Sequence, residues 1–484
     1  MKSLETTNTY ELAELPTGRK AIGCKWVFKK KVDDGNVRFK ARLVAKGFSQ
    51  KYGEDYDLVF APVARAATIR LLLSMAGERK MTVKQFDVKT AFLNGKLDEE
   101  IYMQQPEGFK QGDKVFRLRK SLYGLKQAAR SWNIMLTETL AQSGFKQSPA
   151  DDCLFIKRQG NDRCYIVVHV DDMLLASTNA KMISETQQSL SKSFELKDMG
   201  IVKHFLGIDV FKSEDGSFSI NQEKYITKVA KELKVDQAKP QKYPIQPGYY
   251  GLSCDELLES NEQYRKIIGM LLYISTNTRP DIAASVNILA QKVEKPNKLD
   301  LAEAIRVVKY LNGTKSHRLH LNSDAKSKTL LAYSDANFGE CKVDGKSNSG
   351  VICFVNGGPI AWSSRKQTNV ALSTCEAEYY ATTEAAKEVL WLKTLLASFD
   401  VETNQALQIF NDNQSCIKMI DNGTFMQRTK YIGVKYHFIR DWSKRKVINL
   451  IYCPSEENIA DMLTKPLCGV KLGTLRQQAG LLTN

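Results

Sequence analysis

The chain lacks paired cysteines and long apolar runs. Its ten cysteines are spread singly over 484 residues without a C-x-x-C pair, which argues against a zinc site and favours a reducing compartment. The longest apolar runs, such as "VLWL" and "TLLA", are interrupted by Lys393 and fall far short of the roughly 20 residues that a membrane span requires. The first residues, "MKSLETTNTYELAEL", contain no apolar core of a signal peptide, so we expect neither a membrane span nor secretion.

The chain also has fewer acidic than basic residues. The chain has 70 Lys and Arg against 54 Asp and Glu, a net charge of +16, with +7 in residues 1–51 and +6 in residues 425–484. A polyanion such as nucleic acid is the obvious class of partner, although charge alone favours it only modestly over a solvated basic surface. With 43% hydrophobic residues, the chain is long enough for about two to four globular domains.

The spacing of apolar residues predicts a mixture of strands and helices. Residues 18–47 alternate apolar and basic positions around the turn "DDGN", which is typical of a β-hairpin. "ATIRLLLSMAGE" and "RSWNIMLTETLAQSG" have helical spacing, whereas "MTVKQFDV" predicts a strand that stops at Asp87. The Lys- and Pro-rich stretch "KVDQAKPQKYPIQPGYYG" is expected to be a linker, with helices after it and strands again from about residue 329.

Two adjacent aspartates interrupt the apolar stretch "YIVVHVDDMLLAS", residues 165–177, which predicts two strands that meet at Asp171 and Asp172. Adjacent carboxylates repel unless a divalent cation lies between them, and oxygen ligands suit Mg²⁺ or Mn²⁺. Asp87 also ends an apolar strand and is the natural third ligand. Such a cluster can hold two ions about 3.5–4 Å apart, which activate a 3′-hydroxyl and stabilise a leaving pyrophosphate. An isolated Asp-Asp turn is more often solvent-exposed, so the pair is informative only with its surroundings.

Those surroundings contain six long motifs in a fixed order. They are "FKARLVAKGFSQ", "QFDVKTAFLNGKLDEEIYMQQPEGF", "RLRKSLYGLKQAARSW", "VHVDDMLLA", "FELKDMGIVKHFLGIDV" and "TRPDIAASV". From roughly residue 10 to its end, the chain resembles the reverse transcriptase of Ty1/copia-type LTR retrotransposons. The resemblance implies a multidomain α+β fold, with the fingers, palm and thumb of a right-hand polymerase followed by a helical connection and an RNase H-like α/β domain. It implies fingers and palm at 1–222, a thumb or linker at 223–260, a helical thumb or connection region at 261–327 and the RNase H-like domain at 328–484.

The same resemblance assigns roles to single residues in the polymerase part. Asp87, Asp171 and Asp172 match the metal-binding triad of the palm. The nucleotide-binding positions are Lys40, Arg42, Phe92, Tyr123, Gly124 and Gln127, and the primer grip is Phe205, Leu206 and Gly207. Phe92 is expected to exclude a ribose 2′-hydroxyl and so to favour deoxynucleotides, although an ordinary core phenylalanine is the alternative. Lys40 and Arg42 have an equally good alternative on a solvated hairpin face.

Four carboxylates in the last third stand in an order that resembles the RNase H domain of the same retroelements, where such residues converge on two metal ions. Asp335 ends the strand "LLAYSD", Glu378 lies in the helix "STCEAEYYATTEAAKEVLWL", Asp412 follows "ALQIFN", and Asp461 lies in an expected acidic helix, "EENIADMLTKPL". Glu376 competes with Glu378, and we choose Glu378 because "YYA" follows it, as an apolar residue and alanine follow the ligand in RNase H helices. Asp412 has the alternative of capping the next helix.

His169 departs from the family, which has a tyrosine before "VDD". Strand alternation is expected to point its side chain the same way as Asp171. A metal-ligand role is disfavoured because imidazole suits zinc and copper better than magnesium, and packing beneath the primer strand is favoured. Two further departures are Ala129, where a proline is usual, and the absence of the mobile histidine before Asp461.

The implied function is that of an RNA-directed DNA polymerase with RNase H activity, which copies retrotransposon RNA into DNA by two-metal-ion nucleotidyl transfer and degrades the RNA of the hybrid. The implied cofactor is Mg²⁺, with Mn²⁺ as an alternative, at two ions per active site. The implied partners are an RNA template, a DNA or tRNA primer, the RNA:DNA hybrid and dNTPs, together with the integrase and capsid portions of the same polyprotein, but no membrane.

The sequence contains neither a protease "DTG" nor the His/Cys zinc cluster of an integrase. We therefore expect the reverse transcriptase and RNase H portion of a longer polyprotein, located in a cytoplasmic virus-like particle, with nuclear entry as a further option. Two alternatives stay open. One is a catalytically inactive, nucleic-acid-binding remnant of a retrotransposon polyprotein, and the other is a template-independent nucleotidyltransferase, which explains the aspartate pair but not the four later carboxylates.

Overall fold

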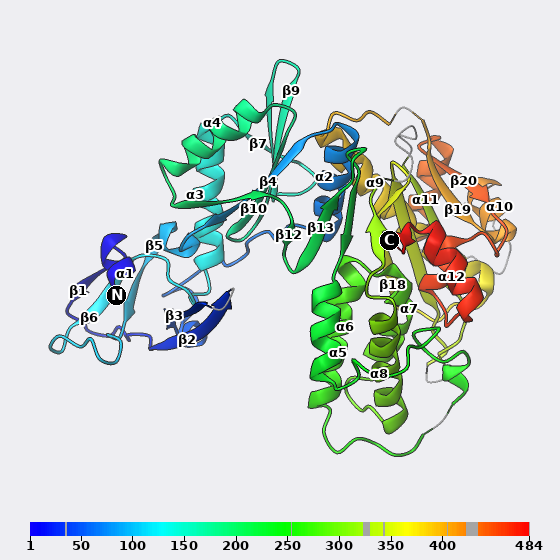
Figure 1. The fold of residues 1–484 in the computed structure, drawn as a ribbon, viewed down its shortest axis with the longest axis horizontal. Coiled ribbons are helices and arrows are strands. Elements are labelled where there is room, and N and C mark those ends of the chain that lie inside the picture. The colour runs from blue at the N-terminus through cyan, green and yellow to red at the C-terminus, as the bar shows by residue number, and fades with distance from the viewer. Residues whose placement is uncertain are drawn as a thin grey trace. The chain divides into compact units, whose positions relative to one another are not determined.

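The computed structural model describes all residues except 34–35, 253, 323–329, 342–343, 404, 423–433 and 484. They form two compact units, drawn in Figure 1. Unit 1 comprises Met1–Ala64 and Thr82–Ile201, and unit 2 comprises Arg65–Met81 and Val202–Asn484. Residues 65–81 and 202–222, which the sequence grouped with the fingers and palm, thus belong to unit 2. Because compactness does not itself delimit fingers, palm and thumb, the four sequence-based boundaries stay a prediction.

The N-terminal part of unit 1 contains a small sheet and a hairpin. The sheet has the order β1 (Tyr10–Ala13), β6 (Val115–Lys120), β5 (Lys96–Met103), and the hairpin is β2 (Cys24–Asp33) with β3 (Asn36–Ala45). A short helix, α1 (Lys2–Thr6), and a 3₁₀ turn, η1 (Gly47–Ser49), accompany them. The basic hairpin expected from residues 18–47 is therefore confirmed, and the central residues of its turn, 34–35, lie outside the described residues.

The rest of unit 1 is a six-stranded antiparallel sheet with helices on one face. Its order is β11 (Leu196–Ile201), β4 (Thr82–Val88), β10 (Asp172–Ser177), β9 (Asp162–His169), β8 (Leu154–Gln159), β7 (Lys146–Gln147). Helices α3 (Ala128–Gln142) and α4 (Ala180–Ser191) share one apolar cluster with Phe86, Ile166 and Met173 of the inner strands. A 3₁₀ turn, η2 (Ala91–Asn94), follows β4. The strands predicted to end at Asp87 and to meet at the aspartate pair are confirmed.

Unit 2 contains a further antiparallel sheet and a group of helices. The sheet has the order β12 (His204–Phe205), β13 (Ile208–Lys212), β14 (Phe218–Asn221), β15 (Arg318–His320), β21 (Leu481–Leu482). Helices α5 (Glu223–Glu232), α6 (Glu262–Asn277), α7 (Ala283–Ala290) and α8 (Lys298–Gly313) pack side by side (Figure 1). The expected linker contains one short 3₁₀ turn, η3 (Tyr249–Gly251), among its described residues, and a second, η4 (Pro280–Ile282), leads into α7.

The C-terminal part of unit 2 is a mixed sheet with the order β18 (Gly358–Lys366), β17 (Asn348–Val355), β16 (Leu331–Asn337), β19 (Leu407–Asn411), β20 (Ile448–Tyr452). The first three strands are antiparallel, and β16, β19 and β20 are parallel. Helix α9 (Thr374–Ser398) packs on this sheet, and α10 (Gln414–Asn422), α11 (Val434–Lys444), a 3₁₀ helix η6 (Ile459–Leu463) and α12 (Gly469–Gln478) complete it. Asn356 and Gly357 form the tight β17–β18 turn at φ 53° and 72°.

Most elements of this part were predicted, with two corrections. The order of strand, hairpin, helix, strand and helix is confirmed, but α11, β20 and α12 were missed. The acidic helix expected around Asp461 is a five-residue 3₁₀ helix, because Pro466 lies shortly after it and favours a non-helical conformation in the residue before it. Among all described helices, none combines the length and apolar character that crossing a membrane would require.

Helix α2 (Ala66–Glu78) is bound into unit 2 by a buried arginine. The Arg70 guanidinium donates to the carbonyl oxygens of Ile360, at 2.7 Å, and Thr276, at 2.9 Å, and lies 3.9 Å from the ring centre of Trp362. Burial lowers the pKa of Arg70 to about 9. The helix predicted from "ATIRLLLSMAGE" is confirmed, and its packing partners come from much later in the chain.

Candidate active sites

Three carboxylates lie together at one end of the large sheet of unit 1. Asp87 of β4 and Asp172 of β10 are directly paired residues of neighbouring strands, and Asp171 belongs to the turn before β10. Asp171 is exposed, whereas Asp87 and Asp172 are half-buried. Burial, followed by the charges of Asp171 and Asp87, raises the pKa of Asp172. The three predicted ligands therefore lie close enough to repel one another, and their oxygen donors suit a hard divalent cation.

The turn that carries Asp171 is held by a buried tryptophan. Val170 has a left-handed backbone, with φ 60°, which is costly for a β-branched residue. The indole Nε1 of Trp132, in α3, donates to the Val170 carbonyl oxygen at 2.7 Å, and the ring packs edge-on against Phe194 at 5.0 Å. This bond stabilises the conformation that presents the aspartate pair. Trp132 lies within a motif quoted above, but its type and spacing indicated no role.

His169 lies directly opposite Asp172 in the β9–β10 pairing and is half-buried. The expectation that its side chain points the same way as Asp171 assumed regular strand alternation. That assumption is wrong, because the left-handed Val170 ends the strand and places Asp171 in the turn. His169 is one of the smaller influences on Asp172, and it opposes the rise of that carboxyl's pKa.

Four of the predicted nucleotide-binding residues lie together in unit 1. The rings of Phe92 and Tyr123 are 5.0 Å apart, and the Arg42 guanidinium lies 5.7 Å from the Tyr123 ring centre. Gly124 has φ 97°, and a Cβ there would lie 2.2 Å from the Ala45 carbonyl oxygen, so only glycine allows this close approach to β3. Their roles toward a nucleotide, and that of the exposed Lys40 on the same strand as Arg42, stay predictions.

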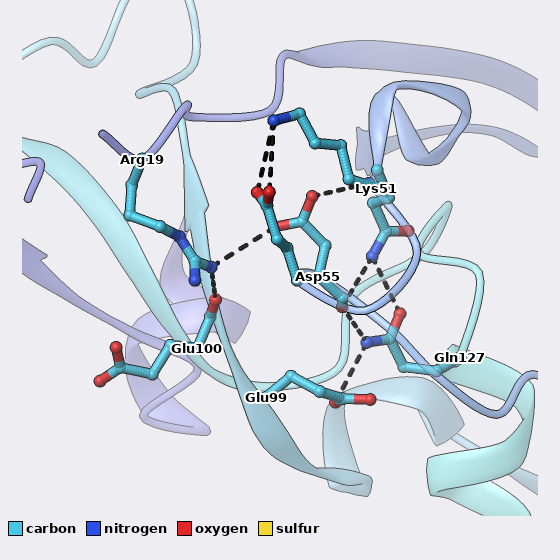
Figure 2. Close-up of polar contacts among 8 residues, drawn as sticks. Arg19, Lys51, Asp55, Glu99, Glu100 and Gln127 are labelled. Atoms are coloured by element: carbon cyan, nitrogen blue, oxygen red, sulfur yellow. Dashed lines mark hydrogen bonds and ion pairs between the residues drawn. The ribbon is translucent and has the colours of Figure 1, made fainter. Parts of the chain in front are cut away.

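Gln127 differs from these four because it points into a buried polar network, as Figure 2 shows. Its amide nitrogen donates to the Asp55 carbonyl oxygen at 2.8 Å and to Glu99 Oε2 at 3.1 Å, and its oxygen accepts from Gln50 at 3.0 Å. Gln127 is only 2% exposed. A direct contact with a nucleotide stays a prediction that this position disfavours, and the side chain instead joins the segment after η1 to the start of α3.

The predicted primer grip is the tight turn between β12 and β13 of unit 2. Leu206 and Gly207 have φ 48° and 74°, which defines a two-residue hairpin turn, and Phe205 before them is buried. The Tyr273 hydroxyl, from α6, donates to the Leu206 carbonyl oxygen, and a Cβ on Gly207 would lie 2.4 Å from that hydroxyl. Tyr273 was not predicted, and its bond resembles that of Trp132 to Val170.

A second acidic cluster lies in the mixed sheet of unit 2. Asp335 of β16, Glu378 of α9 and Asp412 after β19 each offer a carboxylate oxygen, and these atoms all lie within 4.8 Å of one another. Asp335 and Glu378 are buried, and Asp412 is half-buried. The donor set fits a divalent cation with a preference for oxygen ligands, such as Mg²⁺ or Mn²⁺. Three of the four predicted RNase H residues are thus brought together.

The geometry of the cluster places the residues of both alternatives left open for it. Glu378 accepts from the Ala336 backbone N–H at 3.1 Å and from Asn411 Nδ2 at 2.8 Å, and so faces Asp335. Glu376 instead accepts from the Leu372 backbone N–H at 2.8 Å near the start of the helix. Asn413, rather than Asp412, caps α10. Its Oδ1 accepts from the Cys416 backbone N–H at 2.9 Å.

Asp461, the fourth predicted residue, is fully buried beside the cluster and is paired with two lysines. Its Oδ1 lies 2.5 Å from Lys465 Nζ, and its Oδ2 accepts from Lys471 Nζ of α12. Thr464 donates to Asp335, and Ser455 donates to Asp412 at 2.6 Å. These four polar residues were missed. Only Lys465, one helical turn after Asp461, had a spacing that suggested the pair.

Burial dominates the electrostatics of this second cluster. Burial, followed by the charge of Asp461, raises the pKa of Asp335 to about 7, and burial with Asp335 raises the pKa of Glu378 well above its usual value. Burial alone would lower the pKa of Lys465, but Asp335 and Asp461 outweigh it and raise that pKa. Complete ionisation of the cluster is therefore unfavourable unless a cation or proton compensates it.

Comparison with known proteins identifies relatives of the chain. Residues 7–247 match the family described as "Reverse transcriptase (RNA-dependent DNA polymerase)". The chain is 38% identical over 500 residues to the "Retrovirus-related Pol polyprotein from transposon TNT 1-94" of Nicotiana tabacum, an alignment that covers 100% of this chain and 37% of that polyprotein. It is 34% identical over 310 residues to the "Putative transposon Ty5-1 protein" of Saccharomyces cerevisiae, which covers 63% of this chain and 100% of that protein. The chain thus spans little more than a third of the tobacco polyprotein.

A solved structure shares the fold. The structure of "the foamy viral protease-reverse transcriptase in complex with RNA/DNA hybrid" matches with a TM-score of 0.51 and 12% identity, and the match covers 94% of this chain and 52% of that chain. At this identity the likeness concerns the fold alone. The expected fold class, a right-hand polymerase followed by an RNase H-like domain, is confirmed.

Proposed function

Since the chain belongs to the reverse transcriptase family of Ty1/copia-type retrotransposon Pol polyproteins, we propose that it copies RNA into DNA and cleaves the RNA of the resulting hybrid. The observation that carries this proposal is the meeting of Asp87, Asp171 and Asp172 at one end of the unit 1 sheet. A nucleic-acid-binding remnant would gain nothing from keeping three mutually repelling carboxylates in place.

In the polymerase centre, Asp87, Asp171 and Asp172 would hold Mg²⁺ or Mn²⁺. Bound there, the ions supply Lewis-acid activation of the primer 3′-hydroxyl and stabilise negative charge on the leaving pyrophosphate. The protein's own part is positional. Trp132 fixes the turn through Val170, and the tilted Phe92–Tyr123 ring pair with Arg42 supplies an aromatic surface and a cation for the sugar and phosphates of a dNTP.

In the RNase H centre, Asp335, Glu378 and Asp412 would hold the cations that RNA cleavage requires, and Asp461 with its two lysines lies beside them. Thr464 and Ser455 orient Asp335 and Asp412 by hydrogen bonds, as residues around metal ligands commonly do. The proposed partners are an RNA template, a DNA or tRNA primer, the hybrid and dNTPs, and the proposed location is a cytoplasmic virus-like particle.

Primer extension tests the polymerase proposal. The purified chain is given a DNA primer on a defined RNA template with dNTPs and Mg²⁺ or Mn²⁺, beside Asp171→Asn as the matched variant. We expect extension by the wild type only. Folded wild-type protein that binds the template–primer but never extends it would contradict the proposal and support the inactive remnant.

A further inference from the structure

The β2–β3 hairpin has two chemically different faces. Successive strand residues point to opposite sides, and the register pairs Trp26 with Leu43, Phe28 with Ala41 and Lys30 with Phe39. We call the side formed by Trp26, Phe28, Phe39, Ala41 and Leu43 the aromatic face. The opposite side carries Arg42, which lies over Tyr123 in the predicted nucleotide pocket. The aromatic face therefore points away from the residues assigned to dNTP binding.

Two large rings on the aromatic face are exposed to solvent. Phe28 is 76% exposed and Phe39 is 79% exposed. The rings of Trp26 and Phe28 are nearly parallel, with 21° between their planes and 6.4 Å between their centres. Two contacts hold the Trp26 side chain in place. Its ring centre lies 5.8 Å from that of Phe109, and its indole nitrogen donates to the Glu107 carbonyl oxygen at 3.4 Å. An exposed and partly fixed aromatic surface of this kind marks a binding site.

A cation accompanies these rings. Lys30 lies directly opposite Phe39, two residues after Phe28 on the same side of the hairpin, and is exposed. Of the four lysines in residues 24–33, Lys30 alone belongs to the aromatic face by strand alternation. Aromatic rings interleaved with cations suit single-stranded nucleic acid, because unpaired bases stack on the rings while phosphates contact the ammonium groups. A duplex offers no free base faces, and an apolar protein partner would have to desolvate Lys30.

We propose that the aromatic face binds the unpaired 5′ part of the RNA template by stacking of bases on Phe28 and Phe39, with Lys30 at a phosphate. The identity of the strand rests on the proposed function, whereas the stacking rests on the hairpin itself. Such a surface would hold the template outside the active site without reading its sequence, since every base has a face that can stack.

The test compares two template–primer duplexes with the full chain, one blunt and one with an unpaired 5′ RNA overhang of about 12 nucleotides. Fluorescence anisotropy gives the affinity of the wild type, of Phe28→Ser/Phe39→Ser and of Phe60→Ser, which removes a ring that is 73% exposed elsewhere in unit 1. We expect the overhang to raise wild-type affinity at least about tenfold, and the double variant to lose this gain while its blunt-duplex affinity and melting temperature stay unchanged.

Two further readouts separate stacking from charge. Binding of the overhang should quench the tryptophan fluorescence of the wild type more than that of the Trp26→Phe variant. Lys30→Gln should lower the salt dependence of overhang binding by about one counterion, whereas Phe60→Ser should leave that slope unchanged.

An overhang gain that survives in Phe28→Ser/Phe39→Ser, or that Phe60→Ser loses equally, would overturn the proposal. So would a double variant that changes only the oligomeric state, because the occupant would then be a second copy of the chain. Binding does not require catalysis. If the overhang binds through Phe28 and Phe39 but the primer is not extended, only the proposed function is contradicted. If the primer is extended but overhang binding does not depend on these residues, only the present proposal is contradicted.

Discussion

The two acidic clusters use the same ligand type in opposite surroundings. Asp87, Asp171 and Asp172 lie at an open sheet end, where water screens much of their repulsion. Asp335, Glu378 and Asp461 are buried, and their repulsion is offset by a raised pKa of Asp335 and Glu378 and by two lysines on Asp461. The comparison teaches that carboxylate sets of similar composition can depend on cations to different degrees. The open cluster tolerates its charge, and the buried one needs partners.

The largest expected effect tests the open cluster. Asp172→Asn should reduce primer extension by at least about 10³-fold, because it removes a proposed metal ligand. Without metal its melting temperature should not fall, since burial and the charges of Asp171 and Asp87 already disfavour the ionised form. Extension assays and thermal melting in EDTA give both values, with the exposed Asp152→Asn as control. Substantial extension by Asp172→Asn would contradict the assignment.

The buried cluster should respond to pH in the absence of metal. The pKa of Asp335 is about 7 in the folded chain, above its usual 3.8, so the folded state holds this proton more tightly than the unfolded state does. The stabilisation is complete below the unfolded pKa and is lost as pH rises toward about 7. In EDTA we expect the wild-type melting temperature to fall by a few degrees between about pH 5.5 and 7.5, and Asp335→Asn to flatten this fall. A wild-type melting temperature that rises through this range would contradict the account.

Removing one of the two lysines that pair with the buried Asp461 should destabilise unit 2. Lys471→Met leaves the fully buried carboxylate with Lys465 alone, and we expect the free energy of unfolding of unit 2 to drop by about 1–3 kcal/mol without metal. Urea unfolding followed by tryptophan fluorescence measures the change, with the exposed Lys444→Met as control. In the Asp461→Asn background the same substitution should cost little. An equal loss in that background would mean that the pair is not the cause.

Much of this comparison could be predicted from the sequence, and the residues that could not be are those whose partners lie far along the chain. Asp87 lies near the end of one apolar strand, and Asp171 and Asp172 lie between two others, so their meeting follows from the strand pattern. Lys471 reaches Asp461 only because α12 folds back onto η6, which no local spacing encodes. Gln127 lies in a recognisable motif, but the motif alone does not reveal whether its side-chain amide faces a nucleotide pocket or a buried polar network.

A smaller effect is expected from the turn beside the open cluster. Trp132→Phe keeps a ring in α3 but removes the donor to Val170, and we expect about a tenfold lower kcat for extension with an unchanged KM for dNTP. RNA cleavage by the same preparation should not change, which separates this local effect from a general loss of folding. A parallel fall of both activities would instead indicate a structural role.

The smallest effect is expected at His169, the residue that departs from the family. His169→Tyr should keep extension within about threefold of the wild type or raise it, because His169 faces Asp172 across the strand pair without any expected metal bond. Steady-state extension rates decide the matter. A complete loss of extension with an unchanged melting temperature would make His169 a catalytic residue.

One measurement tests the whole account most directly. A single hybrid of labelled RNA template and differently labelled DNA primer reports primer extension and RNA cleavage together for the wild type, Asp171→Asn and Asp335→Asn. The account predicts that the wild type gives both products, that Asp171→Asn still cleaves but does not extend, and that Asp335→Asn still extends but does not cleave. Wild-type protein that is folded yet gives neither product, or variants that each lose both, would contradict it.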